Sequence, residues 1–551
     1  MENFQNNSPK HQRKGRQSFD GMLGGRPVRP AVNSSNRFKP HRISAGDKGQ
    51  GGVKSVDNFK RGNGFHATPQ PGARRPAART TGRNPQRDAR GVIDLTLPAS
   101  GAKSKHHLSR RKKIKRTVAT FAVIIILIVG FLFAKGYIKL HSIFKGGGGA
   151  AALQDNVDPS KLKGEGDGRV NILLLGRGGD GHDGADLTDT ILVASIDPVQ
   201  KKAAILSIPR DLYTPTASNT KINAVFADAK NEALANGSSR SDAENIGFSA
   251  IEKQVTRDMG IPIHYHLMVD FKAFEQAINT VGGVDINVDK DGAVYERLWD
   301  ETTRQNYTLN VQEGQQHFDG QRALFYARSR HTSSRGDFDR AERQRKLILA
   351  LKDKVLSLGT FSNPVKVSQL IDAFGNHISA NMSLSEVMRL YEIGKGIDSN
   401  SVVSIGLADP PNEFVTTGMI NGQSIVRPKA GLTDYTDIQN YVRNALRDGF
   451  LAKENATVAV YNGTETPGLA TKKATELKSF GYTVGTVDNA PTSNYTKTII
   501  VDRTNGQKKY TKHYLETRFG VSATTTMPDS TINPNNADFV IILGQDANSG
   551  G

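Results

Sequence analysis

The sequence predicts a layered α/β protein with a second, small α/β domain near its C-terminal end. Short apolar stretches alternate with segments of helical spacing between residues 169 and 450. A shorter series of the same kind follows between residues 455 and 545. Ahead of both lies a basic tail with few aliphatic residues, which leads into one uninterrupted apolar run. We therefore expect a disordered tail and one transmembrane helix before the folded part.

The large domain shows strands and helices in alternation. We expect strands at 170–175, 190–196, 203–208, 264–269 and 284–288, because each is a short apolar run bounded by turn residues. Apolar residues recur with helical spacing at 241–259, 271–281 and 337–356. This alternation favours a sheet packed against helices.

The small domain has its own complete series of elements. A strand is expected from about Ala456, followed by a helix at 468–480, strands at 482–486 and 498–501, a helix at 508–519 and a last strand at 538–543. This β-α-β-β-α-β order is typical of a small domain that can fold alone.

Residues 117–134 contain no charged side chain and predict a transmembrane helix over 117–139. At a rise of 1.5 Å per residue this run covers roughly 27 Å, close to the hydrocarbon thickness of a bilayer. A cluster of Lys and Arg at 110–116 stands directly before it. The more basic side stays in the cytoplasm, so the C-terminal domains are expected outside. A buried core helix and a cleaved signal peptide are the alternatives.

The basic charge of the chain is concentrated in its tail. Residues 1–116 hold 27 of the 73 Lys and Arg residues but 6 of the 54 Asp and Glu residues, so the folded part is close to neutral. Residues 1–108 are too poor in apolar side chains to form a core, and we expect them to be disordered and cytoplasmic. They could lie against anionic lipid, bind nucleic acid, or have no fixed partner. The absence of cysteine excludes disulfides, cysteine-ligated zinc and a thiol nucleophile.

One glycine motif resembles a dinucleotide site but does not have its spacing. Gly176, Gly178 and Gly181 satisfy G-x-G-x-x-G after a strand. The next strand follows too soon for a crossover helix, so the loop is expected to join neighbouring antiparallel strands. The chain also has no P-loop and no G-x-S-x-G motif, and its His residues have no metal-ligand spacing.

The remaining candidates for a site are arginines and aspartates. Asp189 stands at the start of a predicted strand, and Arg210 follows the end of another. Arg328 and Arg330 are two residues apart, so an extended chain would point both side chains the same way. Asp337 stands where a helix N-cap is expected.

This combination of side chains suits a phosphate ligand. Arg340 and Arg343 share a helix face with Leu347, so that face passes from cationic to apolar. Arginine forks bind phosphate oxygens in pairs, and carboxylates with a substrate phosphate are the usual ligands of Mg²⁺ or Mn²⁺. Ordinary surface ion pairs and a nucleic-acid-binding run are the alternatives. The expected location outside the cytoplasm argues against nucleic acid.

Several segments together resemble the LytR-CpsA-Psr family of bacterial cell-wall glycopolymer transferases. In order, they are NILLLG (171–176), TDTILV (188–193), SIPRDLY (207–213), KINAVF (221–226), VDFKAFEQAINTVGGVDINV (269–288) and ALFYARSRHTSSRGDFDRAERQRKLI (323–348). VAVYNGTETPGLA and DFVIILG, nearer the C-terminus, are similar to the LytR C-terminal domain. The resemblance implies an α-β-α domain over 169–450 and a LytR C-terminal-like domain over 455–545, joined to the bacterial cell membrane by a linker at 140–168.

The family's activity implies a magnesium-dependent phosphotransferase. It would take a glycopolymer from a polyprenyl-pyrophosphate carrier and attach it to peptidoglycan through a phosphodiester, with the lipid tail in an apolar pocket of the α-β-α domain. The resemblance assigns a catalytic role to Arg210 and Asp337. The residues that it implies at the phosphates or the metal are Arg210, Arg328 and Arg330 for the pyrophosphate, Lys221 and Arg343 in support, and Asp189 for Mg²⁺.

Two positions depart from the family's pattern. The family usually has an Asp where this chain has Gly178, and an Arg where it has Leu187. The loop between them offers Asp180, or otherwise Asp183, as a second metal ligand, and Arg177, just before Gly178, is a substitute cation. Without such a replacement we expect a protein that binds polyprenyl-linked or wall polymers and does not catalyse. A polyprenyl-pyrophosphate hydrolase is a further possibility, as is a regulator that binds nucleic acid through its tail.

Overall fold

The computed structural model describes residues 146–215, 220–301, 303–330, 335–357, 375 and 377–548. The predicted tail, the predicted transmembrane helix at 117–139 and residues 140–145 of the linker lie outside these residues. Within the described part of the chain, no helix is long and apolar enough to cross a membrane.

A six-stranded sheet lies at the centre of the large domain. Its strands are β1 (Val170–Arg177), β2 (Thr188–Asp197), β3 (Lys202–Ser207), β6 (Tyr265–Asp270), β11 (Ile378–Ala380) and β12 (Val402–Gly406). Their order in the sheet is β11-β6-β1-β2-β3-β12. β1 pairs with β2 in antiparallel register, as the short glycine loop between them predicted. Since β2 and β3 are also antiparallel, the start of β2 lies beside the end of β3.

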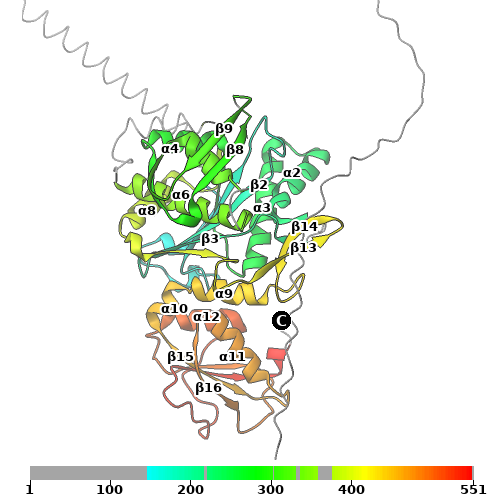
Figure 1. Cartoon of the computed structure of the whole chain (residues 1–551). Coiled ribbons are helices and arrows are strands. Elements are labelled where there is room, and N and C mark those ends of the chain that lie inside the picture. The colour runs from blue at the N-terminus through cyan, green and yellow to red at the C-terminus, as the bar shows by residue number, and fades with distance from the viewer. Residues whose placement is uncertain are drawn as a thin grey trace, which may run out of the picture. The chain divides into compact units, whose positions relative to one another are not determined.

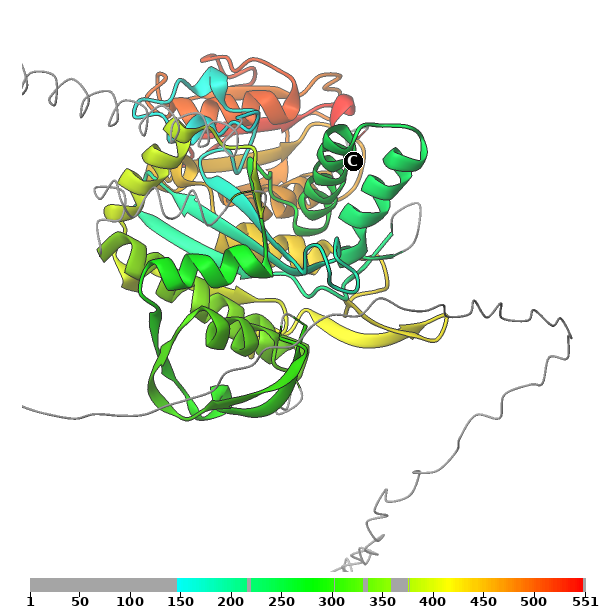
Figure 2. The same cartoon turned by 90° about the horizontal axis from the view of Figure 1, so that it is seen from above.

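Helices cover both faces of this sheet (Figure 1; Figure 2). Successive residues of β1 point to opposite faces. Leu173 packs in one core with side chains of α3 (Arg240–Met259) and α9 (Thr436–Ala445), and α2 (Val225–Ala235) lies on the same side. Ile172 packs in a second core with Leu153 and with α8 (Leu384–Lys395). The large domain therefore has the layered α/β fold that the sequence predicted.

A helical and hairpin layer flanks the sheet and completes the large domain. It consists of α4 (Phe271–Thr280), β7 (Val284–Val288), β8 (Val294–Asp300), β9 (Gln305–Val311), β10 (Gly314–Phe318), α5 (Gly320–Arg328) and α6 (Asp337–Ser357). β8 and β9 form an antiparallel hairpin, and β10 pairs with β7. Among the elements named so far, the sequence analysis did not predict the strands β8 to β12 or the helices α2, α5 and α8.

Two short antiparallel pairs and a helical connection lie elsewhere in the domain. The elements are β4 (Tyr213–Thr214) with β5 (Thr220–Lys221), β13 (Val415–Ile420) with β14 (Gln423–Pro428), and α10 (Gly449–Glu454).

The C-terminal domain has the β-α-β-β-α-β order that its sequence predicted. Its elements are β15 (Thr457–Asn462), α11 (Leu469–Ser479), β16 (Thr483–Asn489), β17 (Ile499–Asp502), α12 (Lys509–Phe519) and β18 (Phe539–Leu543). The sheet order is β16-β15-β18-β17. Both faces of the buried strand β18 carry apolar side chains into a core.

The linker that precedes β1 lies against the C-terminal domain. Val157 and Leu162 pack into that domain's core. Glu165 accepts a hydrogen bond from the hydroxyl of Tyr482 at 2.8 Å and forms an ion pair with Arg518 at 2.7 Å. The described part of the linker therefore belongs structurally to both domains.

Candidate active site

The antiparallel pairing of β2 with β3 brings Asp189 and Arg210 together. Asp189 lies at the start of β2, and Arg210 follows the end of β3. The Arg210 guanidinium donates to Asp189 Oδ1 at 2.8 Å and to Asp337 Oδ2 at 3.0 Å. Burial lowers the pKa of Arg210, but Asp189, Asp337 and Asp211 outweigh it and raise the pKa above its ordinary value. Arg210 is therefore held in place by carboxylates from β2 and α6.

Asp337 lies among three arginines. Besides Arg210, it forms ion pairs with Arg340 at 3.4 Å and with Arg330 at 3.6 Å. Burial raises the pKa of Asp337, but Arg340, Arg210 and Arg330 together bring it below its ordinary value. Asp337 is the first residue of α6 and not the N-cap, so that detail of the prediction was wrong. Its carboxylate is ionised at neutral pH and joins the arginines to each other.

Arg328 and Arg330 do not share an extended segment, because α5 continues through Arg328. The expectation that both side chains point the same way was therefore derived from the wrong backbone conformation. Arg328 forms an ion pair with Glu301 at 3.6 Å and lies 4.7 Å from the ring centroid of Phe271. Burial lowers the pKa of Arg328, while Asp300 and Asp189 act against this and Arg330 adds to it.

A chain of contacts that reaches Arg328 was not predicted from the sequence. His182, in the loop after β1, contacts the carboxylate of Glu301, the same carboxylate that pairs with Arg328. His182 also packs edge-on against Phe271. Burial and Arg328 together lower the pKa of His182, and Asp270 and Asp300 act against them. No motif marks these residues, because His182 and Glu301 are far apart in the sequence.

Lys221 and Arg343, the two supporting cations of the prediction, differ in their surroundings. Lys221 on β5 forms an ion pair with Asp211 at 2.8 Å, and Asp211 also lies 3.6 Å from Arg210. Arg343 is 2% exposed and donates to the carbonyl of Ser329. Its guanidinium also lies 5.6 Å from the ring centroid of Tyr326. Arg343 is thus part of the core beneath the Ser329–Arg330 turn.

The described residues offer few metal ligands. Among them, no three His, Asp or Glu side chains form a group that could hold a metal ion. Asp189 accepts hydrogen bonds from Arg210 and Asn223 and keeps a partly exposed carboxylate. Asp180 is 96% exposed, and its ion pair is with Arg240 at 4.0 Å. The residues fit a magnesium ion through Asp189 only if substrate phosphates supply further ligands.

The loop residues expected to replace the missing family positions have other contacts. Arg177 forms ion pairs with Asp186 at 2.8 Å and Glu244 at 3.7 Å. A Cβ on Gly178 would lie 2.9 Å from Cβ of His182. An Asp at position 178 would therefore require His182 to move.

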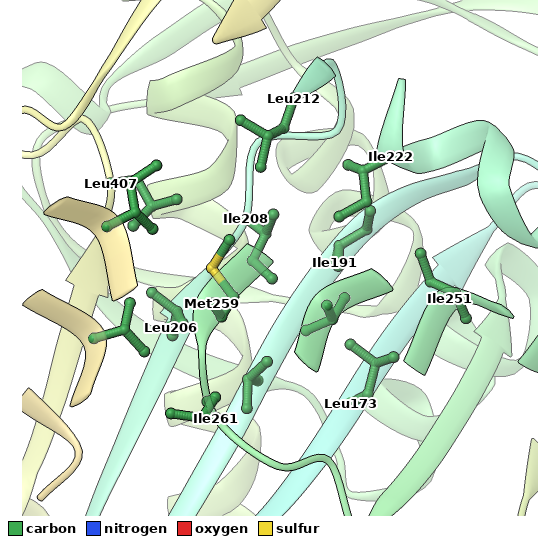
Figure 3. Close-up of a cluster of buried hydrophobic side chains, with 14 of the residues drawn as sticks. Leu173, Ile191, Leu206, Ile208, Leu212, Ile222, Ile251, Met259, Ile261 and Leu407 are labelled. Atoms are coloured by element: carbon green, nitrogen blue, oxygen red, sulfur yellow. The ribbon is translucent and has the colours of Figure 1, made fainter. Parts of the chain in front are cut away.

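A pocket opens beside Arg210 and leads toward the apolar core. Its enclosed volume is about 20 Å³, which is room for little more than one water molecule, and the rest of the space around it is open to solvent. Charged side chains line one part of it, and Ile191, Ile208 and Val426 line another. Ile191 and Ile208 also belong to the large buried cluster between the sheet and its helices (Figure 3). A phosphate group beside Arg210 would therefore border apolar side chains, but the enclosed part of this pocket is too small for the polyprenyl chain that the family resemblance implies.

Comparison with known proteins identifies the family of the chain. The model of the LytR_cpsA_psr family matches residues 139–432, more than half of the chain. The chain belongs to the LytR-CpsA-Psr family. A second model, described as LytR cell envelope-related transcriptional attenuator, matches residues 455–546.

Two relatives show how far members of this LytR-CpsA-Psr family resemble the chain. TagV of Bacillus subtilis, a polyisoprenyl-teichoic acid–peptidoglycan teichoic acid transferase, is 28% identical over 54% of this chain and 71% of its own length. The cell wall biosynthesis protein LcpA of Corynebacterium glutamicum is 26% identical over 70% of this chain and 79% of its own length. The crystal structure of B. subtilis TagV aligns with 51% of this chain and 96% of its own, with 26% identity and a TM-score of 0.38.

Proposed function

We propose that this protein transfers a glycopolymer from a polyprenyl-pyrophosphate carrier to peptidoglycan outside the cytoplasmic membrane of a bacterium. The observation that carries the proposal is the arginine cluster around Asp337, which opens into a pocket backed by apolar core residues. A pyrophosphate between a saccharide and a polyprenyl chain has matching chemistry: two anionic phosphates beside an apolar chain. The name of TagV as a polyisoprenyl-teichoic acid–peptidoglycan teichoic acid transferase supports the same class of substrate, and the name of LcpA as a cell wall biosynthesis protein agrees with it.

In the proposed reaction, a hydroxyl of peptidoglycan attacks the phosphorus that carries the saccharide. The bond from that phosphorus to the bridging oxygen breaks, polyprenyl phosphate leaves, and a phosphodiester joins the two polymers. The hydroxyl's proton passes to solvent or to the leaving phosphate. Arg210, Arg328 and Arg330 stabilise the negative charge that develops on the phosphate oxygens.

Asp337 positions the arginines in this scheme. Three arginines surround it and keep its pKa low, with burial acting in the opposite direction. A carboxylate with a depressed pKa is a weak base, so it is a poor acceptor for the proton of the attacking hydroxyl. Mg²⁺, held by Asp189 and the substrate, would supply further charge neutralisation.

The test uses the full-length chain in detergent with a polyprenyl-pyrophosphate-linked saccharide, peptidoglycan and Mg²⁺. Saccharide transfer and release of polyprenyl phosphate are followed together. Arg210→Ala is expected to lower the transfer rate roughly 100-fold or more, since it removes a fixed donor at the developing charge. Arg210→Lys is also expected to be impaired, because one ammonium group cannot reproduce the fork between Asp189 and Asp337. Lys429→Ala, which breaks an exposed pair with Glu413, is the control.

Each competing function has its own result in this assay. Release of polyprenyl phosphate without transfer would identify a hydrolase. Saturable binding of the lipid-linked saccharide without release of either product would favour the non-catalytic binder, for which the exposure of Asp180 is an argument. Turnover that EDTA does not affect would contradict the magnesium requirement.

A further inference from the structure

The β8–β9 hairpin has two faces of opposite character, and its inner face is part of the site. Along β8, the side chains of Val294, Glu296 and Asp300 are buried. Glu296 accepts hydrogen bonds from the hydroxyl of Ser329 and from the backbone N–H of Arg330. The hairpin is therefore bonded to the turn that places Arg330 beside Asp337.

The outer face of the same hairpin carries exposed aromatic side chains. Tyr295 is 65% exposed and Trp299 is 53% exposed. Among the described residues, these are the aromatic side chains that stand out as exposed large hydrophobics, and both lie on one face of one strand. Trp299 is also the only tryptophan in the sequence. Two aromatics four residues apart on a strand are separated by about 13 Å.

Polar side chains complete this face. Arg297 lies between the two aromatics on β8, and the residues opposite them on β9 are Asn310, Thr308 and Asn306. All four polar residues are exposed. An apolar protein-binding patch would instead show contiguous aliphatic side chains. We call the six residues, Tyr295, Arg297, Trp299, Asn306, Thr308 and Asn310, the hairpin platform.

We propose that the hairpin platform binds the glycan strand of peptidoglycan, the acceptor in the proposed function on which this inference rests. The C–H groups of sugar rings pack on the negatively charged faces of aromatic rings. The hydroxyl and acetamido groups of the sugars form hydrogen bonds with amide and arginine side chains. At this spacing one extended glycan strand of several sugars can span both aromatics. A single cation among amides and hydroxyls suits a glycan better than a polyphosphate, which attracts several cations. The outer face of the β8–β9 hairpin carries the hairpin platform, and its inner face holds the backbone of Arg330 through Glu296. A glycan strand on the platform would therefore lie on the same hairpin that positions Arg330 in the site.

The sole tryptophan makes the platform directly observable. The full-length chain in detergent is titrated with soluble glycan strands released from purified peptidoglycan, and the fluorescence of Trp299 is recorded. The expected result is a saturable shift or change of intensity. Tyr295→Ala keeps the reporter and is expected to weaken binding about 3- to 10-fold. Met419→Ala, whose side chain on β13 is 66% exposed, is the matched control and should bind like the unchanged chain.

A second assay separates this inference from the proposed function. Tyr295→Ala/Trp299→Ala is expected to lose at least tenfold in co-sedimentation with insoluble peptidoglycan, yet to bind the polyprenyl-pyrophosphate-linked saccharide with unchanged affinity. Co-sedimentation equal to that of the unchanged chain would overturn the inference. The inference would also be overturned if a glycerol phosphate polymer changed the fluorescence of Trp299 and peptidoglycan strands did not. If glycan strands change the fluorescence of Trp299 but the unchanged chain turns over no lipid-linked saccharide, the result supports glycan binding by the platform and contradicts the proposed function.

Discussion

Asp448 joins the linker, the last helices of the LytR-CpsA-Psr domain and the C-terminal domain, and its replacement by Asn should loosen that junction. The carboxylate is buried at 2% exposure. One oxygen accepts from the N–H groups that open α10, and the other accepts from the linker and from α12. The donors are Phe450 N and Leu451 N at 2.9 and 3.1 Å, and Gly166 N, Gly168 N and Tyr514 Oη at 3.0, 2.8 and 3.0 Å.

The expected cost of Asp448→Asn follows from these bonds. An amide has one oxygen, so either orientation of the side chain leaves two backbone N–H groups facing an NH₂ group. Each buried donor that loses its acceptor costs about 1–3 kcal/mol, so two of them give a loss of about 2–6 kcal/mol in the free energy of unfolding. At about 2 cal/mol/K of unfolding entropy per residue, a folded unit of about 400 residues should lose roughly 2–7 °C in melting temperature. Thermal unfolding by circular dichroism measures it, and limited proteolysis of the linker shows whether the junction has opened.

Two glycines of the same linker provide a matched pair for this reasoning. A Cβ on Gly168 would lie 2.4 Å from Asp448 Oδ1, whereas a Cβ on Gly164 would meet nothing within 4 Å. Gly168→Ala should therefore destabilise the protein, and Gly164→Ala should leave it unchanged or slightly more stable. Equal melting temperatures for the two alanine variants, or an Asp448→Asn variant within about 1 °C of the unchanged chain, would refute the role assigned to Asp448.

Three further predictions concern the LytR-CpsA-Psr domain. Burial raises the pKa of Asp258 to about 7 in the folded state, whereas its ordinary value is 3.8. Protonation of Asp258 therefore stabilises the folded state. This stabilisation is complete below about pH 4 and is lost as the pH rises through 7. Asp258→Asn should remove this dependence in denaturant titrations at pH 5 and 8, unlike the exposed Asp291→Asn. Arg343→Met should lower transfer by displacing the turn above it, with polymer transfer and melting temperature measured together; full activity would contradict a positioning role. Gly178→Asp should lower transfer because His182 must move, and a gain in activity would show that the family's Asp can be restored directly.

Much of the fold was predictable because local patterns and packing agree there. β1, β2 and β3 are apolar runs that lie in the middle of a sheet covered on both faces, and all three were found from the sequence. The C-terminal domain was predicted element by element for the same reason. Asp189, Arg210 and Asp337 were also identified together, and the structure places them within hydrogen-bonding distance of each other through Arg210.

The pairing of charges was not predictable, because it depends on contacts between distant segments. Arg328 ends helix α5 and forms an ion pair with Glu301, a contact that its spacing from Arg330 did not indicate. Asp180 was chosen for its place in the loop, but the structure leaves its carboxylate almost fully exposed. Sequence spacing indicated which residue types meet at the site and gave no information on which of them are neutralised by a partner.

The hairpin of β8 and β9 escaped prediction for a physical reason that also bears on its role. In VYERLWD the alternation of a strand is present, but Glu296 and Asp300 point inward while Tyr295 and Trp299 point outward, which inverts the usual hydrophobic pattern. A buried carboxylate is costly unless it is hydrogen-bonded, and Glu296 meets that condition through Ser329 and Arg330. Places where a sequence breaks a local rule are often sites of function, because an interaction there offsets the cost. The β8–β9 hairpin departs from the usual hydrophobic pattern in two ways. Glu296 points inward and holds the backbone of Arg330, and Tyr295 and Trp299 point outward into solvent. Within the described part of the chain, neither aromatic belongs to a hydrophobic core, which is why we assign them to an external ligand.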